Sequence, residues 1–155
     1  MTFIIKSSDF MHNGIIPRRF SCDGEDLSPS LEWEDAPKET KSFVLIMDDP
    51  DAPMGIWDHW LLFNIPSNMT KLEAGITQLP EGTKVGINSW QRNDYGGPCP
   101  PDREHRYFFK LYAVNTMLDL PHGATKREIE EAIQPYIISQ AILVGRYNRP
   151  QNMKS

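Results

Sequence analysis

Three apolar runs, separated by long polar segments, constrain the fold of this chain more than any other feature of its sequence. They are "SFVLIM" (42–47), "HWLLFNI" (59–65) and "RYFFKLYAV" (106–114), and a fourth run, "ILVGRY" (142–147), follows near the end. The segments between them are rich in Pro, Gly, Asn and Asp, which favour turns. Both alternating sets of positions are apolar over much of each run, as in central strands that are covered on two sides. We therefore predict a β-rich chain.

One segment carries a clear helix signal. Thr125 precedes "KREIEEAI" (126–133), Glu128 stands three residues after it as in a capping box, and Pro135 limits the length of the helix. Since strands dominate, the predicted fold is mainly β, a sandwich or barrel with a peripheral C-terminal helix. The 155 residues suit a single domain over 1–155, because no repeat, low-complexity tract or linker interrupts the chain.

Charge and hydropathy argue against two classes of partner. The formal net charge of −5 is spread along the chain, so there is no basic surface for nucleic acid. No apolar stretch approaches the roughly 20 residues of a membrane span, and the N-terminal "MTFIIKSSDF" is too quickly polar for a signal peptide. We therefore expect a cytoplasmic protein with no nucleic-acid partner and no stable membrane insertion.

The two cysteines give no diagnostic pattern. Cys22 and Cys99 lie far apart in sequence, so they indicate neither a disulfide framework nor a Cys-x-x-Cys site for a metal or for redox chemistry. Two buried thiols are the simplest interpretation. A single disulfide stays open as an alternative, because it depends on a proximity that sequence does not show.

Pairs of polar or aromatic residues stand at the ends of three apolar runs. Residues two apart in a strand point to the same side, so each pair continues one side of its run. The pairs, each with the apolar side that it continues, are Asp49 and Asp51 (Phe43, Leu45, Met47), Trp57 and His59 (Leu61, Phe63, Ile65), and His105 and Tyr107 (Phe109, Leu111, Ala113). If the three ends meet, they form a small pocket with an apolar floor, two imidazoles, two carboxylates, a phenol and an indole.

These side chains suit an anionic ligand. His59 and Tyr107 can donate hydrogen bonds to an anion, and Trp57 can form a wall. Asp49 or Asp51 can accept the other imidazole N–H, which favours the charged ring, or can receive an ammonium group of the ligand. A phosphate-type anion, alone or carrying an ammonium group, is therefore the predicted ligand.

Two other uses of the same residues stay open as alternatives. Asp49, Asp51, His59 and His105 are competent metal ligands, but their spacing matches no diagnostic metal motif. A metal-independent hydrolase needs a nucleophile, and no serine lies in a Gly-x-Ser-x-Gly sequence. We therefore predict a binding protein with no catalytic residues, no cofactor and no metal.

Several separated motifs resemble the signature segments of one family. "DPDAP" (49–53), "WDHW" (57–60) and "GGPCPPDREHRYFFKLYA" (96–113) are similar to those of the phosphatidylethanolamine-binding proteins, also called Raf kinase inhibitor proteins. "FSCDGEDLSPSLEW" (20–33) and "ILVGRYNR" (142–149) resemble the bacterial and archaeal YbhB/YbcL-like branch. The resemblance runs in order from about Ser21 to Arg149 and covers nearly the whole chain.

The resemblance implies a fold of two packed antiparallel sheets with a small anion pocket. Carried over to this chain, the ligand-binding residues are Asp49, Asp51, Trp57, His59, Gly97, His105 and Tyr107. Gly97 would let a ligand approach a backbone N–H. The resemblance also implies a cis peptide bond before Pro53.

The resemblance further suggests ligands and partners. The ligands are phosphate, acetate, phosphoethanolamine and phosphotyrosine-like groups. The family is associated with regulation, through protein kinases or through inhibition of serine proteases, and its prokaryotic members are often homodimers. A protein kinase, a serine protease and a second copy of the chain are therefore the expected classes of protein partner.

One departure from the family pattern lies beside the predicted pocket. Only Asp102, Arg103 and Glu104 separate Pro101 from His105, a shorter and more charged connection than in animal relatives. We expect this difference to change the entrance of the pocket.

A second departure lies near the C-terminus. Pro135 and Tyr136 stand where many bacterial relatives have Gly-His. This difference predicts a kinked or shortened helix end and a change at the rim of the pocket rather than at its floor.

Overall fold

The computed structural model describes residues 2–153, and the predicted strands and helix are present in it. The strands are β1 (Ile4–Lys6), β2 (Gly14–Ile15), β3 (Leu31–Glu34), β4 (Ser42–Asp49), β5 (Trp57–Pro66), β6 (Lys71–Leu72), β7 (Lys84–Val85), β8 (His105–Val114) and β9 (Ile137–Tyr147). The helices are α1 (Lys126–Ile133) and the 3-10 turns η1 (Arg18–Phe20), η2 (Gln134–Tyr136) and η3 (Pro150–Met153). The four apolar runs form β4, β5, β8 and β9.

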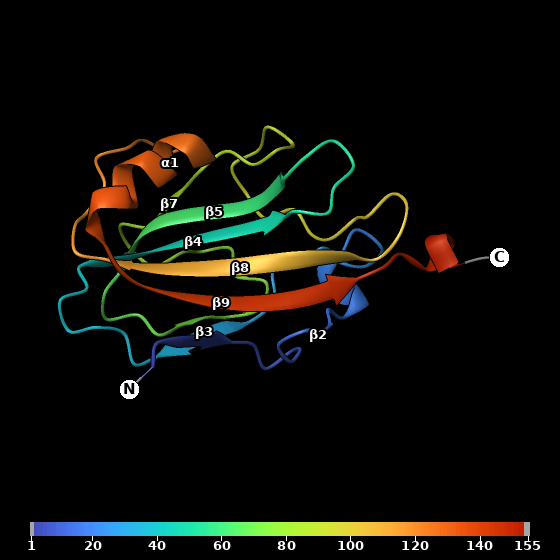
Figure 1. Cartoon of the computed structure of the whole chain (residues 1–155), viewed down its shortest axis with the longest axis horizontal. Coiled ribbons are helices and arrows are strands. Elements are labelled where there is room, and N and C mark those ends of the chain that lie inside the picture. The colour runs from blue at the N-terminus through green and yellow to red at the C-terminus, as the bar shows by residue number, and fades with distance from the viewer. Residues whose placement is uncertain (1, 154–155) are drawn as a thin grey trace.

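The strands form two sheets that pack face to face (Figure 1). The large sheet has the order β2-β9-β8-β4-β5-β7, and the small sheet has the order β1-β3-β6. All pairings are antiparallel except the two-residue pairing of β2 with β9. The prediction of a mainly β sandwich with a peripheral C-terminal helix is confirmed.

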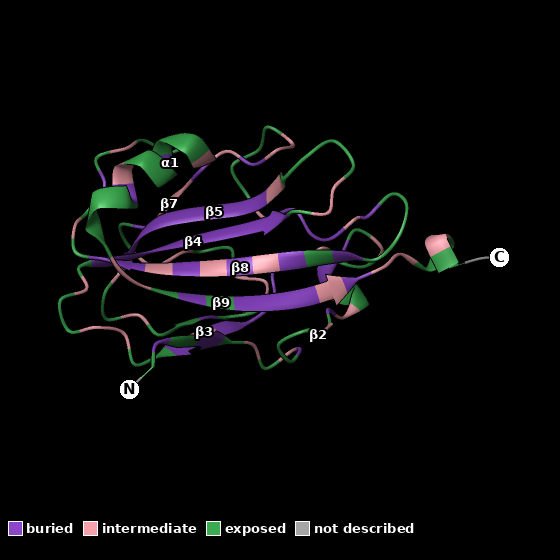
Figure 2. Ribbon diagram, in the orientation of Figure 1, coloured by how far each residue is buried: buried purple, intermediate pink, exposed green. Residues whose placement is uncertain are grey.

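Two apolar clusters cover the two faces of the large sheet. The first lies between the sheets and joins Trp33 of β3 to Met47, Phe109 and Leu143 of the large sheet. The second lies between the large sheet and α1, where Ile129 contributes to it. The central strands are therefore buried on both faces, as Figure 2 shows, which explains why both alternating sets of their positions are apolar.

Two β-bulges in β5 change which of its side chains face each cluster. Met47 of β4 pairs with Trp60, but the next residue, Asp48, pairs with Asp58, so His59 is an extra residue in the ladder. A second irregularity lies between the pairs Phe43–Ile65 and Leu45–Leu62.

The predicted grouping of side chains along β5 is therefore wrong in part. Leu61 and Phe63 belong to the cluster under α1, whereas Ile65 belongs to the cluster between the sheets. The bulge brings His59 onto the face of Tyr107, and the two ring centroids lie 5.2 Å apart. Strict alternation fails here because each inserted residue reverses the side to which the following residues point.

The capping box of α1 is confirmed. Thr125 Oγ1 accepts a hydrogen bond from the Glu128 backbone N–H at 3.1 Å, and Glu128 Oε1 accepts one from the Thr125 N–H at 2.9 Å. The helix ends at Ile133, and Pro135 lies in the 3-10 turn that follows it. The helix therefore ends before Pro135, as the position of this proline predicted, and a difference in length from the relatives stays a prediction.

The simplest interpretation of the cysteines is wrong, because Cys22 and Cys99 form a disulfide with a Cα–Cα distance of 5.4 Å. The Cys22 N–H donates a hydrogen bond to the Pro98 carbonyl at 3.0 Å, which joins two loops that are 77 residues apart in sequence. The two cysteines come together only in the tertiary fold, so their separation along the sequence did not predict the disulfide.

The peptide bond before Pro53 is trans, as are all others within residues 2–153, so the predicted cis bond is wrong. The loop turns instead at Gly55, whose φ of 110° is accessible to glycine and whose N–H donates to the Ala52 carbonyl. No helix within the same residues is long and apolar enough to cross a membrane.

Candidate functional site

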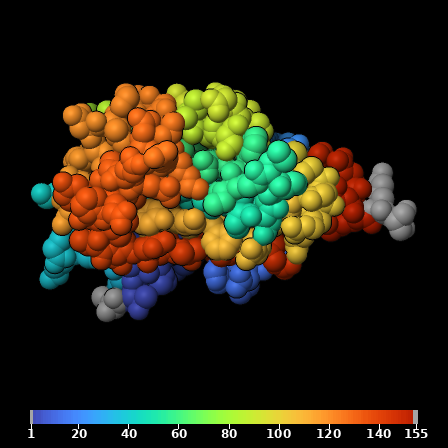
Figure 3. All heavy atoms as spheres, turned by 45° about the horizontal axis from the view of Figure 1, so that its top comes forward, coloured from blue at the N-terminus to red at the C-terminus, as the bar shows by residue number. Residues whose placement is uncertain are grey.

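A cavity of about 250 Å³ lies where β4, β5 and β8 end or begin together. Its lining residues are Asp49, Ala52, Pro53, Met54, Trp57, His59, Trp90, Cys99, Pro101, His105 and Tyr107. At the surface, the loop around residues 50–56 lies beside the loop around residues 100–104 (Figure 3). The three strand ends therefore meet, which is the condition for a shared pocket.

His105 is held from both sides by carboxylates. Its Nδ1 lies 2.6 Å from Asp49 Oδ2, and its Nε2 lies 2.8 Å from Asp102 Oδ1. Both ring nitrogens are therefore engaged by carboxylate oxygens. Burial raises the pKa of Asp49, and the hydrogen bond from His105 offsets part of that rise. His105 therefore has no free ring nitrogen for a ligand.

His59 has one committed nitrogen and one free nitrogen. Its Nδ1 lies 2.7 Å from the Gly96 carbonyl, which can only accept, so Nδ1 carries the proton. Burial lowers the pKa of His59 to about 4, which keeps the ring neutral at pH 7. Nε2 is then a hydrogen-bond acceptor, and this differs from the donor role that the sequence analysis assigned to His59.

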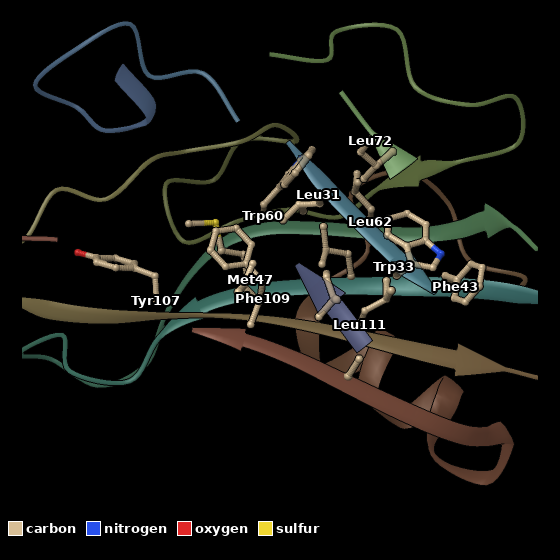
Figure 4. Close-up of a cluster of buried hydrophobic side chains, with 14 of the residues drawn as sticks. Leu31, Trp33, Phe43, Met47, Trp60, Leu62, Leu72, Tyr107, Phe109 and Leu111 are labelled. Carbon is tan, nitrogen blue, oxygen red and sulfur yellow. The ribbon is translucent and has the colours of Figure 1, made fainter. Parts of the chain in front are cut away.

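Tyr107 supplies a free hydrogen-bond donor. Its side chain is fully buried, and its hydroxyl has no hydrogen-bond partner within residues 2–153. Burial raises the pKa of Tyr107, so the hydroxyl keeps its proton. Figure 4 shows this hydroxyl pointing away from the other labelled core side chains. A buried unpartnered hydroxyl beside a cavity is a group that a ligand can satisfy.

Two tryptophans form an aromatic wall. Trp57 and Trp90 meet edge to face with ring centroids 5.6 Å apart, and Trp90 also packs against His59 at 4.9 Å. Trp90 is not among the residues predicted from the sequence, because it lies in a loop and belongs to no apolar run. Asn88 holds this loop, because its Oδ1 accepts from the Trp90 N–H and its Nδ2 donates to the Asp94 carbonyl.

Two of the predicted ligand-binding residues do not line the cavity. Asp51 accepts three hydrogen bonds from Arg106, one from the backbone N–H and two from the guanidinium, which lower the pKa of Asp51 to about 2. The Gly97 N–H donates to Asp26 Oδ1 at 2.9 Å, and a Cβ at this position would collide with the Phe20 carbonyl. Gly97 is therefore required for close packing, and its N–H is occupied.

The two departures from the family pattern differ in their relation to the cavity. Asp102, in the short connection 102–104, binds His105 directly. Pro135 and Tyr136 lie in η2, which contributes no residue to the lining. The predicted effect on the pocket is therefore supported by the structure only for the first departure.

A metal ion has no ligand set here. Within residues 2–153, no group of three or more His, Cys, Asp or Glu side chains is arranged to hold one. Both nitrogens of His105 and the carboxylate of Asp51 are already engaged by protein groups. The structure therefore gives no support to the metal-binding alternative.

Comparison with known proteins places the chain in a family. The family model for phosphatidylethanolamine-binding protein matches residues 6–148. The chain is 47% identical over 148 residues to the UPF0098 protein of Methanothermobacter thermautotrophicus, with 94% of this chain and 98% of that protein covered. The UPF0098 protein of Aquifex aeolicus is also 47% identical, with 92% and 86% covered.

Solved structures agree in fold. The crystal structure of a phosphatidylethanolamine-binding protein homolog from Chlamydia trachomatis is 37% identical and matches with a TM-score of 0.91, covering 96% of this chain and 98% of that one. Escherichia coli YbcL, described as a new member of the mammalian family, is 29% identical, with a TM-score of 0.90 and coverage of 96% and 99%. This chain belongs to the phosphatidylethanolamine-binding protein family.

Proposed function

We propose that this chain is a binding protein whose cavity takes a small phosphate-type anion. The Tyr107 hydroxyl carries the proposal, because it is buried at the cavity with no partner among residues 2–153. A buried hydroxyl without a hydrogen-bond partner lowers the stability of the fold by about 1–3 kcal/mol, and an anion that accepts a hydrogen bond from it removes that cost. The His105 ring lies next to Tyr107, at 6.5 Å between ring centroids, and its contact with Asp49 fixes that carboxyl group in the cavity wall.

The size and walls of the cavity fit a head group. A volume of about 250 Å³ suits a phosphate, phosphoethanolamine or phosphotyrosine-like group rather than a polymer. Trp57 and Trp90 provide apolar contact for the part of the ligand that is not ionised. The family name points to the same chemistry, since phosphoethanolamine carries a phosphate.

Binding is favoured over catalysis by the residues that surround the cavity. No serine, threonine or lysine lines it, and its cysteine, Cys99, is held in a disulfide. A metal-independent hydrolase needs a nucleophile next to a base, and His59 makes its one side-chain hydrogen bond to a backbone carbonyl. The hydrolase alternative is therefore the weaker of the two.

The biological setting stays a prediction. A regulatory role through a protein kinase or a serine protease, a homodimer and a cytoplasmic location are expectations from the sequence. The Cys22–Cys99 disulfide bears on the last of these, because disulfides are typical of oxidising compartments and are otherwise common mainly in hyperthermophiles.

The proposed function is tested by titrating phosphate and phosphoethanolamine while following histidine ring signals by NMR. We expect saturable shifts at His59 and His105, and an affinity about tenfold lower in Tyr107→Phe, since one hydrogen bond to a charged group is lost. Tyr136→Phe, at an exposed tyrosine far from the cavity, should bind as the unaltered protein does. Unmoved ring signals at millimolar concentrations of both ligands would contradict the proposal.

A further inference from the structure

The cavity offers a ligand one free acceptor and one free donor. The acceptor is His59 Nε2, because Nδ1 carries the ring proton and donates a hydrogen bond to the Gly96 carbonyl. The donor is the Tyr107 hydroxyl, which has no partner within residues 2–153. No lysine or arginine is among the lining residues. A ligand that satisfies both groups must therefore donate one hydrogen bond and accept another.

The charges around the cavity disfavour a doubly ionised ligand. Asp49 lines the cavity, and Asp49 and Asp102 each place a carboxylate oxygen on a ring nitrogen of His105. Asp51 adds no net charge because Arg106 pairs with it. The carboxyl group of Asp49 therefore stands in the lining with no lysine or arginine beside it there, and a dianion would meet more repulsion from it than a monoanion in a partly buried site.

The surroundings of His59 also resist protonation of its ring. The titratable groups that share the cavity with the ring are Asp49 of β4 and His105 and Tyr107 of β8. Asp48 of β4, on the opposite face of the sheet, acts on the ring through its charge. Two lysines compensate Asp48, and His105 compensates Asp49. Trp90 covers the ring on its remaining side. With its nearest negative charges already paired, the buried ring is more stable as the neutral acceptor.

We propose that the cavity selects an oxyanion that still carries one acidic proton, such as a phosphate monoester in its singly ionised form. Its P–O–H donates to His59 Nε2, and a second phosphoryl oxygen accepts from the Tyr107 hydroxyl. This inference rests on the proposed function and adds the protonation state of the ligand to it. A sulfate ester has the same shape and a single charge but no proton to donate, so it leaves His59 Nε2 unsatisfied.

The proposal predicts a pH dependence that belongs to the ligand. The second ionisation of a phosphate monoester has a pKa of about 6, so the singly ionised fraction rises about 25-fold between pH 7.5 and pH 5.5. The affinity for methyl phosphate should rise by the same factor. A sulfate ester keeps its single charge over this range, so the affinity for methyl sulfate should be weak and nearly independent of pH.

Calorimetric titration of the intact chain with methyl phosphate and methyl sulfate at pH 7.5, 6.5 and 5.5 tests the proposal. We expect methyl phosphate to bind at least tenfold more tightly than methyl sulfate at pH 5.5, with the difference shrinking as the pH rises. If methyl sulfate binds as tightly as methyl phosphate, or strengthens as the pH falls, the proton resides on His59 and the proposal is overturned while anion binding stands. If neither ligand binds at pH 5.5, the proposed function fails as well.

A substitution at His59 tests whether its ring causes the preference for methyl phosphate over methyl sulfate. Glutamine at position 59 offers both a donor and an acceptor, so His59→Gln should bind the two esters within about threefold of each other and lose most of the pH dependence. His122→Gln alters an exposed histidine that is not part of the cavity and should preserve both the selectivity and the pH dependence. Unchanged selectivity in His59→Gln would overturn the role of His59 Nε2. The comparison in the unaltered chain does not depend on how well the variant folds.

Discussion

Asp48 and Asp49 are neighbours at the end of β4, and they stand in different environments on opposite faces of the large sheet. Asp48 Oδ2 accepts from Lys110 at 3.0 Å and from Lys126 of α1 at 2.9 Å. Asp49 Oδ2 accepts from His105 at 2.6 Å and lines the cavity. Both side chains are almost fully buried, with exposed fractions of 1% and 3%.

The difference between the two faces lies in the partners and not in burial or charge. On the helix face both carboxylates form ion pairs with lysines, so the group of Asp48, Asp58, Lys110 and Lys126, here the lysine cluster, balances its own charges. On the other face the partner of Asp49 is the imidazole of His105, and His59 Nε2 and the Tyr107 hydroxyl remain free. A buried carboxylate therefore indicates a ligand site only where its surroundings leave hydrogen-bonding groups unsatisfied.

The largest effect is expected from the disulfide, which fixes the wall of the cavity. Opening a cross-link between residues 77 apart lowers the free energy of unfolding by about 4 kcal/mol in the chain-entropy account. The double variant Cys22→Ser/Cys99→Ser should show this loss in denaturant unfolding. It should also weaken anion binding, because the neighbouring loop holds His59 through the Gly96 carbonyl.

Reduction of the unaltered protein by dithiothreitol gives the matched measurement. It should reproduce the lower midpoint of unfolding without any substitution. A double variant as stable as the unaltered protein, with unchanged affinity, would show that the cavity wall does not depend on the cross-link.

The next largest effect is a pH dependence of stability that arises from His59, on the cavity face of the sheet. The pKa of His59 is about 4 in the folded chain and about 6.5 when unfolded, so the unfolded state binds the extra proton between these values. The contribution of His59 to the free energy of unfolding is therefore fully present above pH 6.5. It falls by about 3 kcal/mol in total as the pH is lowered toward 4. Asp49 and Asp58 do not add to this loss, because their pKa values are raised in the folded chain.

Denaturant unfolding between pH 7.5 and pH 4 measures this dependence. His59→Gln should remove most of the slope between pH 6.5 and pH 4, whereas His122→Gln should keep it. Equal slopes in both variants would mean that the acid sensitivity arises outside the cavity.

A smaller loss of stability, with no loss of binding, is expected on the helix face. Lys126→Met leaves Asp58 without its cation and Asp48 with one cation instead of two. Because Lys110 remains, we expect a loss of about 2 kcal/mol, below the range for a fully broken buried pair. Anion affinity should stay within twofold of the unaltered value, since the lysine cluster does not line the cavity.

Lys38→Met, at an exposed lysine, is the control for removing one positive charge and should change neither quantity. If Lys126→Met abolished anion binding instead, the two faces would be coupled and the comparison between them would fail.

The sequence predicted the strands, the helix and five of the cavity residues because these follow from local rules. Apolar runs and the Thr125–Glu128 capping box act over a few residues and do not depend on the rest of the fold, and strand alternation holds wherever no bulge interrupts the strand. Asp49, His105 and Tyr107 obey alternation, so the sequence predicted the side to which each one points. The distances between them depend on how the strands pair, which the sequence pattern did not predict.

The remaining features depend on contacts between distant segments. The bulge at His59 is chosen by the pairing of β5 with β4, and it reverses the side on which alternation places the following residues. Asp51 follows a turn after β4, where alternation no longer applies, and it turns to Arg106. Trp90 and the Cys22–Cys99 bond are brought to the cavity by loops whose paths no short pattern encodes.

The smallest change in stability is expected from Tyr107→Phe, although its effect on binding is large. The Tyr107 hydroxyl has no partner to lose, so the free energy of unfolding without ligand should stay within about 1 kcal/mol of the unaltered value or increase. Tyr147→Phe is the matched control, because the Tyr147 hydroxyl donates to Asp23 at 2.7 Å and its loss should cost about 1.5 kcal/mol. Denaturant unfolding with and without phosphate measures both variants. A large loss of stability in Tyr107→Phe without ligand would mean that its hydroxyl serves the fold, and the distinction between a closed face and an open one would no longer hold.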